Sequence, residues 1–380
     1  MNSKNVYRWS VTATILLFCS NLLGYIQGVS YLQYVIIIIS IMFIPGYIIV
    51  RKNDFSIWIV SIFWTYILIV TMFNGADIKS IAHTIKTICG VIVVYSLGKI
   101  CLKSYLKGVY SVAKVMLLLN TLSCFFINNG ILKSETGYPV YILGTRNSMG
   151  AVIIYLILMM LIYDEKYFQA IRKSTIIVCI IGAAGSVYLW SATTIIALGI
   201  ILIYAVTRYN AFFCKMIDAI NIKITYIFGI LCFLLINIFR MQEVFAFLIE
   251  SVLKRTINFT ARTYIWDIDM VLIKNKFFFG YGQYSKELLR TAYFQPENAH
   301  NFFFELFLMG GIVGFLIFSY MILKTSKKLN TITDKKVSEW ICCYFLIIMI
   351  TGITESTILN FGVYAMFALI NVMSNNQKEV

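Results

Sequence analysis

The sequence predicts an all-α polytopic membrane protein with about 12 transmembrane helices and one large external loop. Hydrophobic residues make up 60% of the 380 residues and charged residues only 13%, whereas soluble proteins contain about 45–50% and about 25%. The mean hydropathy is +0.83. Because one span needs roughly 20 apolar residues, a dozen spans with short loops fill the chain. Residues 1–380 are therefore expected to form a single integral membrane domain.

The apolar runs divide into twelve predicted spans, with a long polar segment late in the chain. Most connecting loops are short, and the longest ones cover residues 128–146 and 240–300. Long loops usually carry function, and amphipathic patterns at 244–257 and 262–275 predict helices on the outer membrane face. The predicted spans cover approximately residues 9–27, 32–50, 55–73, 80–100, 108–127, 147–163, 174–190, 191–207, 222–239, 301–323, 337–355 and 357–373.

The basic residues indicate how the chain is oriented. If the N-terminus is cytoplasmic, most of the 32 Lys and Arg residues lie at cytoplasmic ends of the predicted spans, as the positive-inside rule requires. The net charge of +15 is thus explained by topology, and we expect no nucleic-acid partner. Both termini are predicted to be cytoplasmic and 240–300 external. Met1–Ser10 leads into a full-length span, so no cleavable signal peptide is expected.

The sequence predicts neither a metal site nor a disulfide bond. The chain has two histidines, His83 and His300, and the 240–300 loop contains no cysteine, so neither a zinc site nor a disulfide is predicted there. Asp267 and Asp269 would diverge by about 200° on a helix, whereas a metal needs convergent oxygen ligands. We therefore expect no metal and no cofactor.

Arg262 and Trp266 stand four residues apart in the external loop, so they share one face of the predicted helix. Two interpretations are open. The pair can anchor the loop at the membrane surface, with Trp at the headgroup level and Arg on lipid phosphate. Alternatively, the guanidinium can clamp a phosphate or diphosphate through paired hydrogen bonds.

His300 stands where the external loop re-enters the membrane, and Asn301 and Glu305 follow it into the span. Such groups are costly in lipid unless they face protein or a cavity. His300 can cap the span and hydrogen-bond a loop. It can also act chemically, either as a general base or as a cation beside phosphate, since imidazole titrates near neutral pH.

The order of the short motifs resembles the O-antigen ligase and polymerase superfamily. The resemblance covers the layout of the whole chain, with about a dozen spans and one large external loop late in the sequence. At residue level it rests on 144–150 and 262–314. The motifs are Gly144-Thr145-Arg146-Asn147-Ser148-Met149-Gly150, Arg262-x3-Trp266, Gly280-x-Gly282, His300-Asn301 with Glu305-Leu306, and Gly311-x2-Gly314.

This resemblance implies a metal-independent glycosyltransferase with a helical fold of the C type in the bacterial cytoplasmic membrane. Members act on undecaprenyl-pyrophosphate-linked glycans outside that membrane. The implied function is an O-antigen or capsule polysaccharide polymerase: a sugar hydroxyl of one lipid-linked repeat unit attacks the anomeric carbon of the donor, and undecaprenyl pyrophosphate leaves. The implied partners are the lipid-linked oligosaccharide, membrane lipid, and flippase and chain-length regulator proteins.

The resemblance also assigns roles to individual residues, with one departure from the family pattern. Many members carry a Ser-x-Ser-Arg-type motif where this chain has 190–194, Trp-Ser-Ala-Thr-Thr, so one phosphate-binding cation is missing or supplied from elsewhere. Polymerases vary more here than ligases, which favours a polymerase. The implied roles are catalysis by His300 and Arg262, diphosphate binding by Arg146 and Arg255, and support by Trp266, Asn147, Asn301 and Glu305.

Two other functions stay open on the sequence alone. A ligase would transfer finished glycan to a different acceptor, and nothing in the sequence identifies the acceptor. A flippase for lipid-linked oligosaccharide would also have about twelve spans, but it should show repeated halves and ionisable residues along a central cavity. No convincing internal repeat is visible. His83, Lys86 and Lys114 are the clearest ionisable residues within the predicted spans.

Overall fold

The computed structural model describes residues 55–134, 137–207, 220–241, 262–283 and 298–375. These residues form mainly helices, and each predicted span from residue 55 onward coincides with one. The first two predicted spans and the predicted helix at 244–257 lie outside the described residues. The elements are α5 (Phe55–Phe73), α6 (Ile78–Ile100), α7 (Leu102–Phe126), α8 (Ser148–Phe168), α9 (Lys173–Tyr188), α10 (Ala192–Thr207), α12 (Ile222–Cys232), the π-helix η2 (Phe233–Ile238), α13 (Arg262–Asn275), α15 (Phe302–Leu329), α16 (Lys335–Thr351), the 3-10 helix η5 (Thr357–Leu359) and α17 (Phe361–Asn375).

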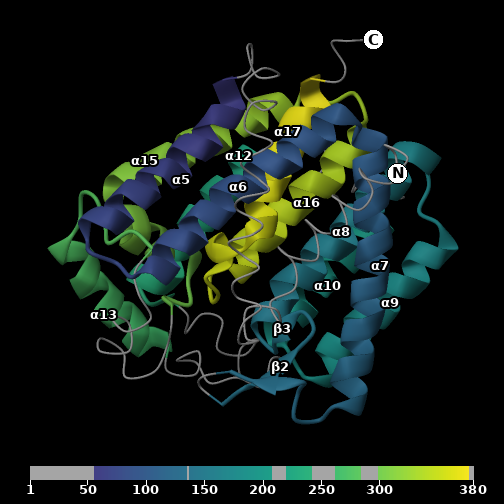
Figure 1. Ribbon diagram of the computed structural model, residues 1–380, viewed down its shortest axis with the longest axis horizontal. Helices are drawn as coiled ribbons and strands as arrows, with labels where there is room; N and C mark the ends of the chain where they lie inside the picture. The colour runs from purple at the N-terminus through teal and green to yellow at the C-terminus, as the bar shows by residue number, and fades with distance from the viewer. Residues whose placement is uncertain (1–54, 135–136, 208–219, 242–261, 284–297, 376–380) are drawn as a thin grey trace.

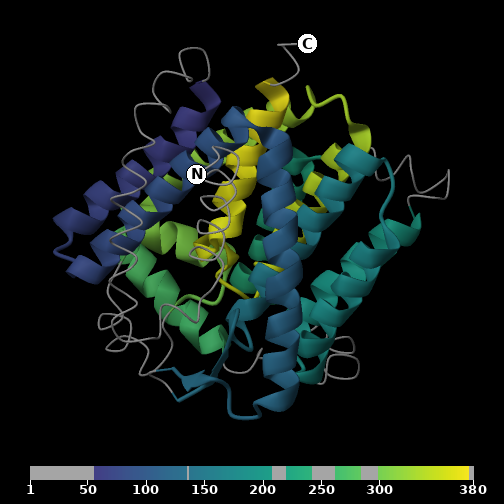
Figure 2. The same cartoon turned by 45° about the vertical axis from the view of Figure 1, so that its right-hand side comes forward.

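Within this part of the chain, four helices are long and apolar enough to cross a membrane: α6, α7, α8 and α15. Shorter apolar helices pack with them. Figure 1 shows α5 beside α15 on one flank and α7 beside α9 on the other, with α6, α17, α16 and α8 between them. Figure 2 shows the same order from a second direction. The bundle therefore has the form expected of a multi-pass membrane protein.

Burial follows the position of each helix in the bundle. Helix α8 is buried from Val152 through Glu165, and nearly every side chain of α17 is buried as well. The outer helices expose apolar side chains instead, such as Ile180 on α9 and Leu202 on α10. An exposed apolar surface of this kind suits lipid and is rare on soluble monomers. The central helices thus supply the core, and the outer faces fit a bilayer.

A small antiparallel sheet shows that the all-α prediction is incomplete. Strands β1 (Leu132–Lys133), β2 (Pro139–Tyr141) and β3 (Gly144–Thr145) pair in that order. The sheet lies between α7 and α8, in the predicted loop 128–146 (Figures 1 and 2). Asn120 of α7 accepts a hydrogen bond from the Leu143 N–H at 2.9 Å. This bond fixes the segment that leads to Arg146 and the start of α8.

Helix α15 is broken at Gly311 (φ 57°, ψ −159°), although its sequence predicted one continuous span. The segment 277–283 docks on the break and supplies the backbone partners that the interrupted helix lacks. Such partners are needed because an unsatisfied backbone group is costly in apolar surroundings. The bonds are Tyr281 N–H to Leu308 O (2.7 Å), Gly282 N–H to Met309 O (2.9 Å), Ile312 N–H to Phe277 O (2.8 Å), Val313 N–H to Phe278 O (3.2 Å) and Tyr66 Oη to Gly310 O (2.8 Å).

Glycine is required at this junction because two backbones touch. Gly280 and Gly311 both have positive φ, and a Cβ on Gly280 would come within 2.7 Å of the Gly311 nitrogen. The turn after α13 thus leads into a junction that joins the end of α13 to the middle of α15. The first nine residues of α15, 302–310, are held against α13 through this junction.

The C-terminal end of α8, away from Arg146, carries a separate polar cluster. The Asp164 carboxylate is fully buried and accepts hydrogen bonds from Arg172 Nε (2.8 Å) and Thr175 Oγ1 (2.6 Å). The Arg172 guanidinium also lies 4.0 Å from the ring centroid of Phe168. Breaking one partner of a buried pair typically costs about 3–5 kcal/mol. This cluster fixes the connection between α8 and α9.

Candidate active site

Several elements that are distant in sequence meet at one end of the bundle. They are the starts of α10, α13 and α15, together with residues 352–356, which connect α16 to η5. Phe302 N–H donates to Gly352 O at 2.7 Å, and the Asn301 side chain donates to Ile353 O at 2.9 Å. The beginning of α15 is thus attached directly to the connection that carries Glu355.

Arg262 and Glu355 form the central contact of this region. Arg262 Nη2 lies 2.8 Å from Glu355 Oε1, and Thr193 Oγ1 donates to the same oxygen at 3.3 Å. The two charged side chains are only 19% and 16% exposed. Among the described residues, the Arg262 guanidinium makes no other hydrogen bond, so most of its N–H donors can bind a ligand.

His300 lies on the other side of the same carboxylate. Its Nδ1 is 3.7 Å from Glu355 Oε2, too far for a hydrogen bond but close enough for electrostatic interaction. Nδ1 is buried and has no hydrogen-bond partner among the described residues. The backbone of His300 has φ +49°, a left-handed conformation that is uncommon for residues other than glycine and can indicate strain at a functional site.

The surroundings of Glu355 keep its carboxyl group ionised. Burial by itself would raise the pKa of Glu355, but the His300 imidazole and the Arg262 guanidinium outweigh this effect, and the pKa lies below its ordinary value. A carboxylate beside an imidazole can orient the ring and stabilise its protonated form. Glu355 can therefore act on both Arg262 and His300.

Asn301 and Glu305 hold the loop around His300. Asn301 is the N-cap of α15, and its side chain accepts from two backbone N–H groups of the first turn. Glu305 is buried, and its Oε2 accepts from the Ala299 N–H at 2.9 Å and from Ser356 Oγ at 2.8 Å. One carboxylate thus binds the direct neighbours of both His300 and Glu355. The cap of this span is Asn301, so His300 does not have the capping role.

Trp266 does not lie at a membrane surface, because its side chain is fully buried. The indole packs near the Phe304 ring, with 6.4 Å between centroids, and under the guanidinium of Arg240. The anchoring interpretation is therefore wrong for Trp266. Arg240 also pairs with Asp267, on the exposed side of α13.

The predicted helix at 262–275 is confirmed as α13, and its two aspartates point in different directions. Asp267 is 61% exposed, whereas Asp269 is fully buried. Within the described residues, no three His, Cys, Asp or Glu side chains are grouped as metal ligands. The divergence expected for positions two apart on a helix is thus confirmed.

Arg146 and Asn147 are exposed at the start of α8, and the Asn147 side chain caps nothing. Gly150, one turn further, packs so closely on Thr194 that a Cβ there would clash with its hydroxyl. Thr194 follows Thr193, which binds Glu355. Arg146 therefore begins a helix that borders the site, but the structure gives it no contact with Arg262 or His300. Arg255 lies outside the described residues.

No sequence motif pointed to Glu355. A weaker signal was present, however: a single acidic residue between two apolar spans is costly unless it is paired. The chain contains only 17 Asp and Glu residues, so each one near a span was informative. Its partner Arg262 is 93 residues away, and that distance concealed the pairing.

The described cluster is not strongly positive. If the imidazole is neutral, the positive charge of Arg262 is offset by the negative charge of Glu355. The carboxylate of the buried Glu305 then gives the cluster a formal net charge of −1. A diphosphate would bring more negative charge, so further cations are needed to bind it. The cluster fits proton transfer and one guanidinium contact better than a complete diphosphate clamp.

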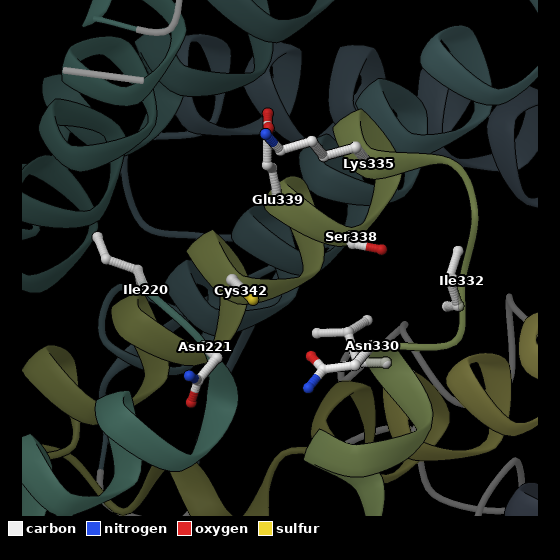
Figure 3. A pocket seen from close by; sticks show the side chains of 9 residues that line it. Ile220, Asn221, Asn330, Ile332, Lys335, Ser338, Glu339 and Cys342 are labelled. Carbon is white, nitrogen blue, oxygen red and sulfur yellow. The ribbon is translucent and has the colours of Figure 1, made fainter. Parts of the chain in front are cut away.

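The described residues also form a pocket at the opposite end of α15. It has a volume of about 380 Å³ and lies between the starts of α12 and α16 and the end of α15. Figure 3 shows Asn221, Asn330, Lys335 and Glu339 around it. None of the sequence-predicted site residues lines this pocket. It is therefore distinct from the Arg262–Glu355–His300 cluster.

The helical bundle and the buried polar cluster define a multi-pass membrane protein with a candidate active site at one end. Residues 137–319 match the family model of the O-antigen ligases, and this match supports the place of the chain in the O-antigen ligase and polymerase superfamily. The matched range includes Arg146, Arg262 and His300 and ends before Glu355. No curated protein matches this chain. The match supports a general role as an enzyme of the glycosyltransferase or ligase type.

Proposed function

We propose that the protein is a polysaccharide polymerase that joins undecaprenyl-pyrophosphate-linked oligosaccharide repeat units on the outer face of the bacterial cytoplasmic membrane. The observation that carries the proposal is the meeting of Arg262, His300 and Glu355 at one end of the bundle. All three belong to segments that the Lys and Arg distribution predicts to be external. The same distribution supports twelve spans, cytoplasmic termini and an external 240–300 loop.

In the proposed reaction, a hydroxyl oxygen of the acceptor sugar attacks the anomeric carbon of the donor glycan. A new glycosidic C–O bond forms, and the bond between the anomeric carbon and the diphosphate oxygen breaks. The hydroxyl proton passes to His300, and undecaprenyl pyrophosphate leaves with the electron pair. One direct displacement of this kind inverts the anomeric configuration. General-base assistance typically contributes about 10²–10⁴-fold to the rate.

Glu355 supports both partners in this scheme. It faces Nδ1 of His300, which leaves Nε2 as the nitrogen that accepts the proton. As the imidazole becomes positively charged, the carboxylate stabilises it. The separation of 3.7 Å is compatible with a bond that tightens when substrate binds, because catalytic hydrogen bonds are often long without substrate.

Arg262 is the proposed partner of the leaving diphosphate. A guanidinium binds phosphate oxygens through two parallel hydrogen bonds, and Arg262 uses only one nitrogen for Glu355. Because the cluster lacks further positive charge, Arg146 and Arg255 are proposed to bind the rest of the diphosphate. Asn301 and Glu305 then position the surrounding backbone, and Asn147 is proposed to support Arg146 beside it.

Deletion of the gene in its native host tests the proposed function. A polymerase mutant should accumulate glycan of one repeat unit, both on lipid and on the final acceptor. The wild-type gene should restore long chains, and Arg262→Ala should not. Repeat units trapped on the cytoplasmic side would indicate a flippase and overturn the proposal.

A ligase is the second candidate, because the matched family model is that of the O-antigen ligases. Its deletion phenotype differs. Polymer of normal length would remain attached to undecaprenyl pyrophosphate, and the final acceptor would carry none. The same chemistry of Arg262, His300 and Glu355 would then join finished glycan to another acceptor.

A further inference from the structure

Helix α9 ends in a motif that normally requires glycine, yet the residue there is Trp190. The Ser191 N–H donates to Ser186 O at 3.0 Å, and the Trp190 N–H donates to Val187 O at 2.9 Å. This pair of bonds is the Schellman arrangement, in which the residue after the C-cap is left-handed and is usually glycine. Trp190 has φ +53°.

A tryptophan in this conformation is less stable than glycine, because its Cβ crowds the backbone. Residues held in such conformations often belong to functional sites. The cost therefore suggests that the side chain at position 190 has a use of its own. No backbone requirement explains it, since glycine would make the same two hydrogen bonds.

The position of Trp190 is close to the candidate active site. Thr193, which donates to Glu355 at 3.3 Å, is three residues further along. Three residues span at most about 11 Å between Cα atoms, so Trp190 is within that distance of a residue that binds the site carboxylate. Ser191 Oγ and Thr194 Oγ1 are 2.9 Å apart and buried, which fixes the intervening backbone.

The indole of Trp190 is also accessible. It is 53% exposed, whereas Trp64, Trp266 and Trp340 are fully buried. Among the described residues, no aromatic ring stacks on it. Tryptophan offers a large, rigid apolar face with a polar N–H at its edge. The apolar C–H face of a pyranose ring is complementary to such a surface, and sugar hydroxyls can bond the N–H.

We propose that Trp190 is a carbohydrate-binding residue, on which a sugar ring of the lipid-linked glycan stacks next to the reacting bond. This inference rests on the proposed function and assigns the substrate class that position 190 recognises. The competing role is an interfacial tryptophan that contacts lipid headgroups. The two roles differ in whether glycan binding depends on the side chain.

The substitution Trp190→Gly provides a clean test, because it relieves the left-handed conformation and should leave the fold intact. The matched control is Gln169→Gly, since Gln169 also has φ +53° and is exposed at the end of α8 far from the site. The substrate is the lipid-linked repeat unit extracted from the deletion strain. We expect Trp190→Gly to raise KM about three- to tenfold, as loss of one aromatic stack would, with little change in kcat. Trp190→Phe should recover most of the affinity, and Gln169→Gly should resemble wild type.

A second measurement keeps this inference separate from the proposed function. The oligosaccharide is released from the same lipid by mild acid, and its binding to purified protein is followed by saturation-transfer NMR. Loss of signal in Trp190→Gly, with signal retained in wild type and Gln169→Gly, supports sugar binding even if wild type makes no polymer. Equal signals in all three proteins would overturn the carbohydrate-binding role of Trp190. An unchanged KM in Trp190→Gly, with only a lower amount of protein in the membrane, would overturn it as well. Absence of polymer from wild type would count against the polymerase alone.

Discussion

Arg262 and Glu355 are 93 residues apart in sequence, yet their side chains form a hydrogen-bonded ion pair of 2.8 Å. The pair joins the first residue of α13 to the connection between α16 and η5. His300 approaches the same carboxylate from the start of α15. The geometry leads to five predictions, each of which separates a chemical role from a structural one.

Arg262→Ala should abolish polymer formation and leave the protein level near normal. The variant loses a charge-assisted contact to diphosphate, which is worth about 1.5–3 kcal/mol. Arg262→Lys should recover little, because an ammonium cannot reproduce paired guanidinium bonds. Polymer length on a gel and protein level on a blot are the measurements. Lys274→Ala, on the exposed last turn of the same helix, is the control. Full activity of Arg262→Lys would reduce the role of Arg262 to a simple charge.

Glu355→Gln should lower thermal stability in detergent at neutral pH. Its pKa lies below the ordinary value in the folded protein, so its stabilising contribution is present above that ordinary value and is lost as pH falls through the lowered one. The difference in unfolding temperature between wild type and variant should therefore shrink in acid. A difference that grows in acid would show that the folded-state pKa is raised instead.

The pH dependence of polymer formation should identify the role of His300. If His300 is the base, the rate falls as pH decreases, because the protonated imidazole cannot accept a proton. If it is a cation beside phosphate, the rate falls as pH increases. We expect the first pattern in wild type and its loss, with much lower turnover, in His300→Ala. If His300→Ala turned over substrate nearly as fast as wild type at every pH tested, the catalytic site would lie elsewhere.

Glu305 should matter through position, not through direct contact with substrate. Its carboxylate binds Ala299 N–H and Ser356 Oγ, the neighbours of His300 and Glu355. Glu305→Ala should lower kcat and leave KM nearly unchanged, whereas Glu305→Gln keeps an acceptor oxygen and should recover part of the rate. A large rise in KM in Glu305→Ala would argue that Glu305 touches the substrate itself.

Cysteine labelling should establish which end of the bundle faces outward. In a background without the nine native cysteines, Tyr138→Cys, exposed just before β2, should react with an impermeant maleimide in intact cells. Thr331→Cys, exposed between α15 and α16, should react only after permeabilisation. The reverse pattern would place the Arg262–Glu355 pair on the cytoplasmic side and exclude the proposed external chemistry.

The elements that sequence patterns predicted well are those set by local composition. Apolar runs located α8 and α16 because a span is defined by length and hydropathy, and an amphipathic pattern located α13. The two- and three-residue strands of the sheet were too short to leave a periodic signal. The break at Gly311 was missed because glycines are common inside transmembrane spans, so Gly310 and Gly311 did not distinguish a broken helix from a continuous one.

The residues of the candidate active site could be predicted only where local sequence marks them. Arg262, His300 and Glu305 belong to short motifs, so their neighbourhood in the sequence indicated a function. Glu355 belongs to none, and its importance arises only when α13 and α15 are packed against the connection after α16. Tertiary contacts of this kind have no local signature. The membrane-anchoring interpretation of Trp266 was wrong because an amphipathic pattern does not reveal which face is covered by another helix.

The break at Gly311 divides α15 into a short segment that carries the candidate active site and a longer segment beyond it. Rotation along an α-helix is about 100° per residue, so one residue inserted before Gly311 would turn His300 away from Glu355. An insertion after Val313 would instead fall on the other side of the break, because residues 277–283 bond to the helix backbone on both sides of Gly311. The helical register of the candidate active site is thus set by the nine residues 302–310 and not by the longer segment of α15 beyond the break.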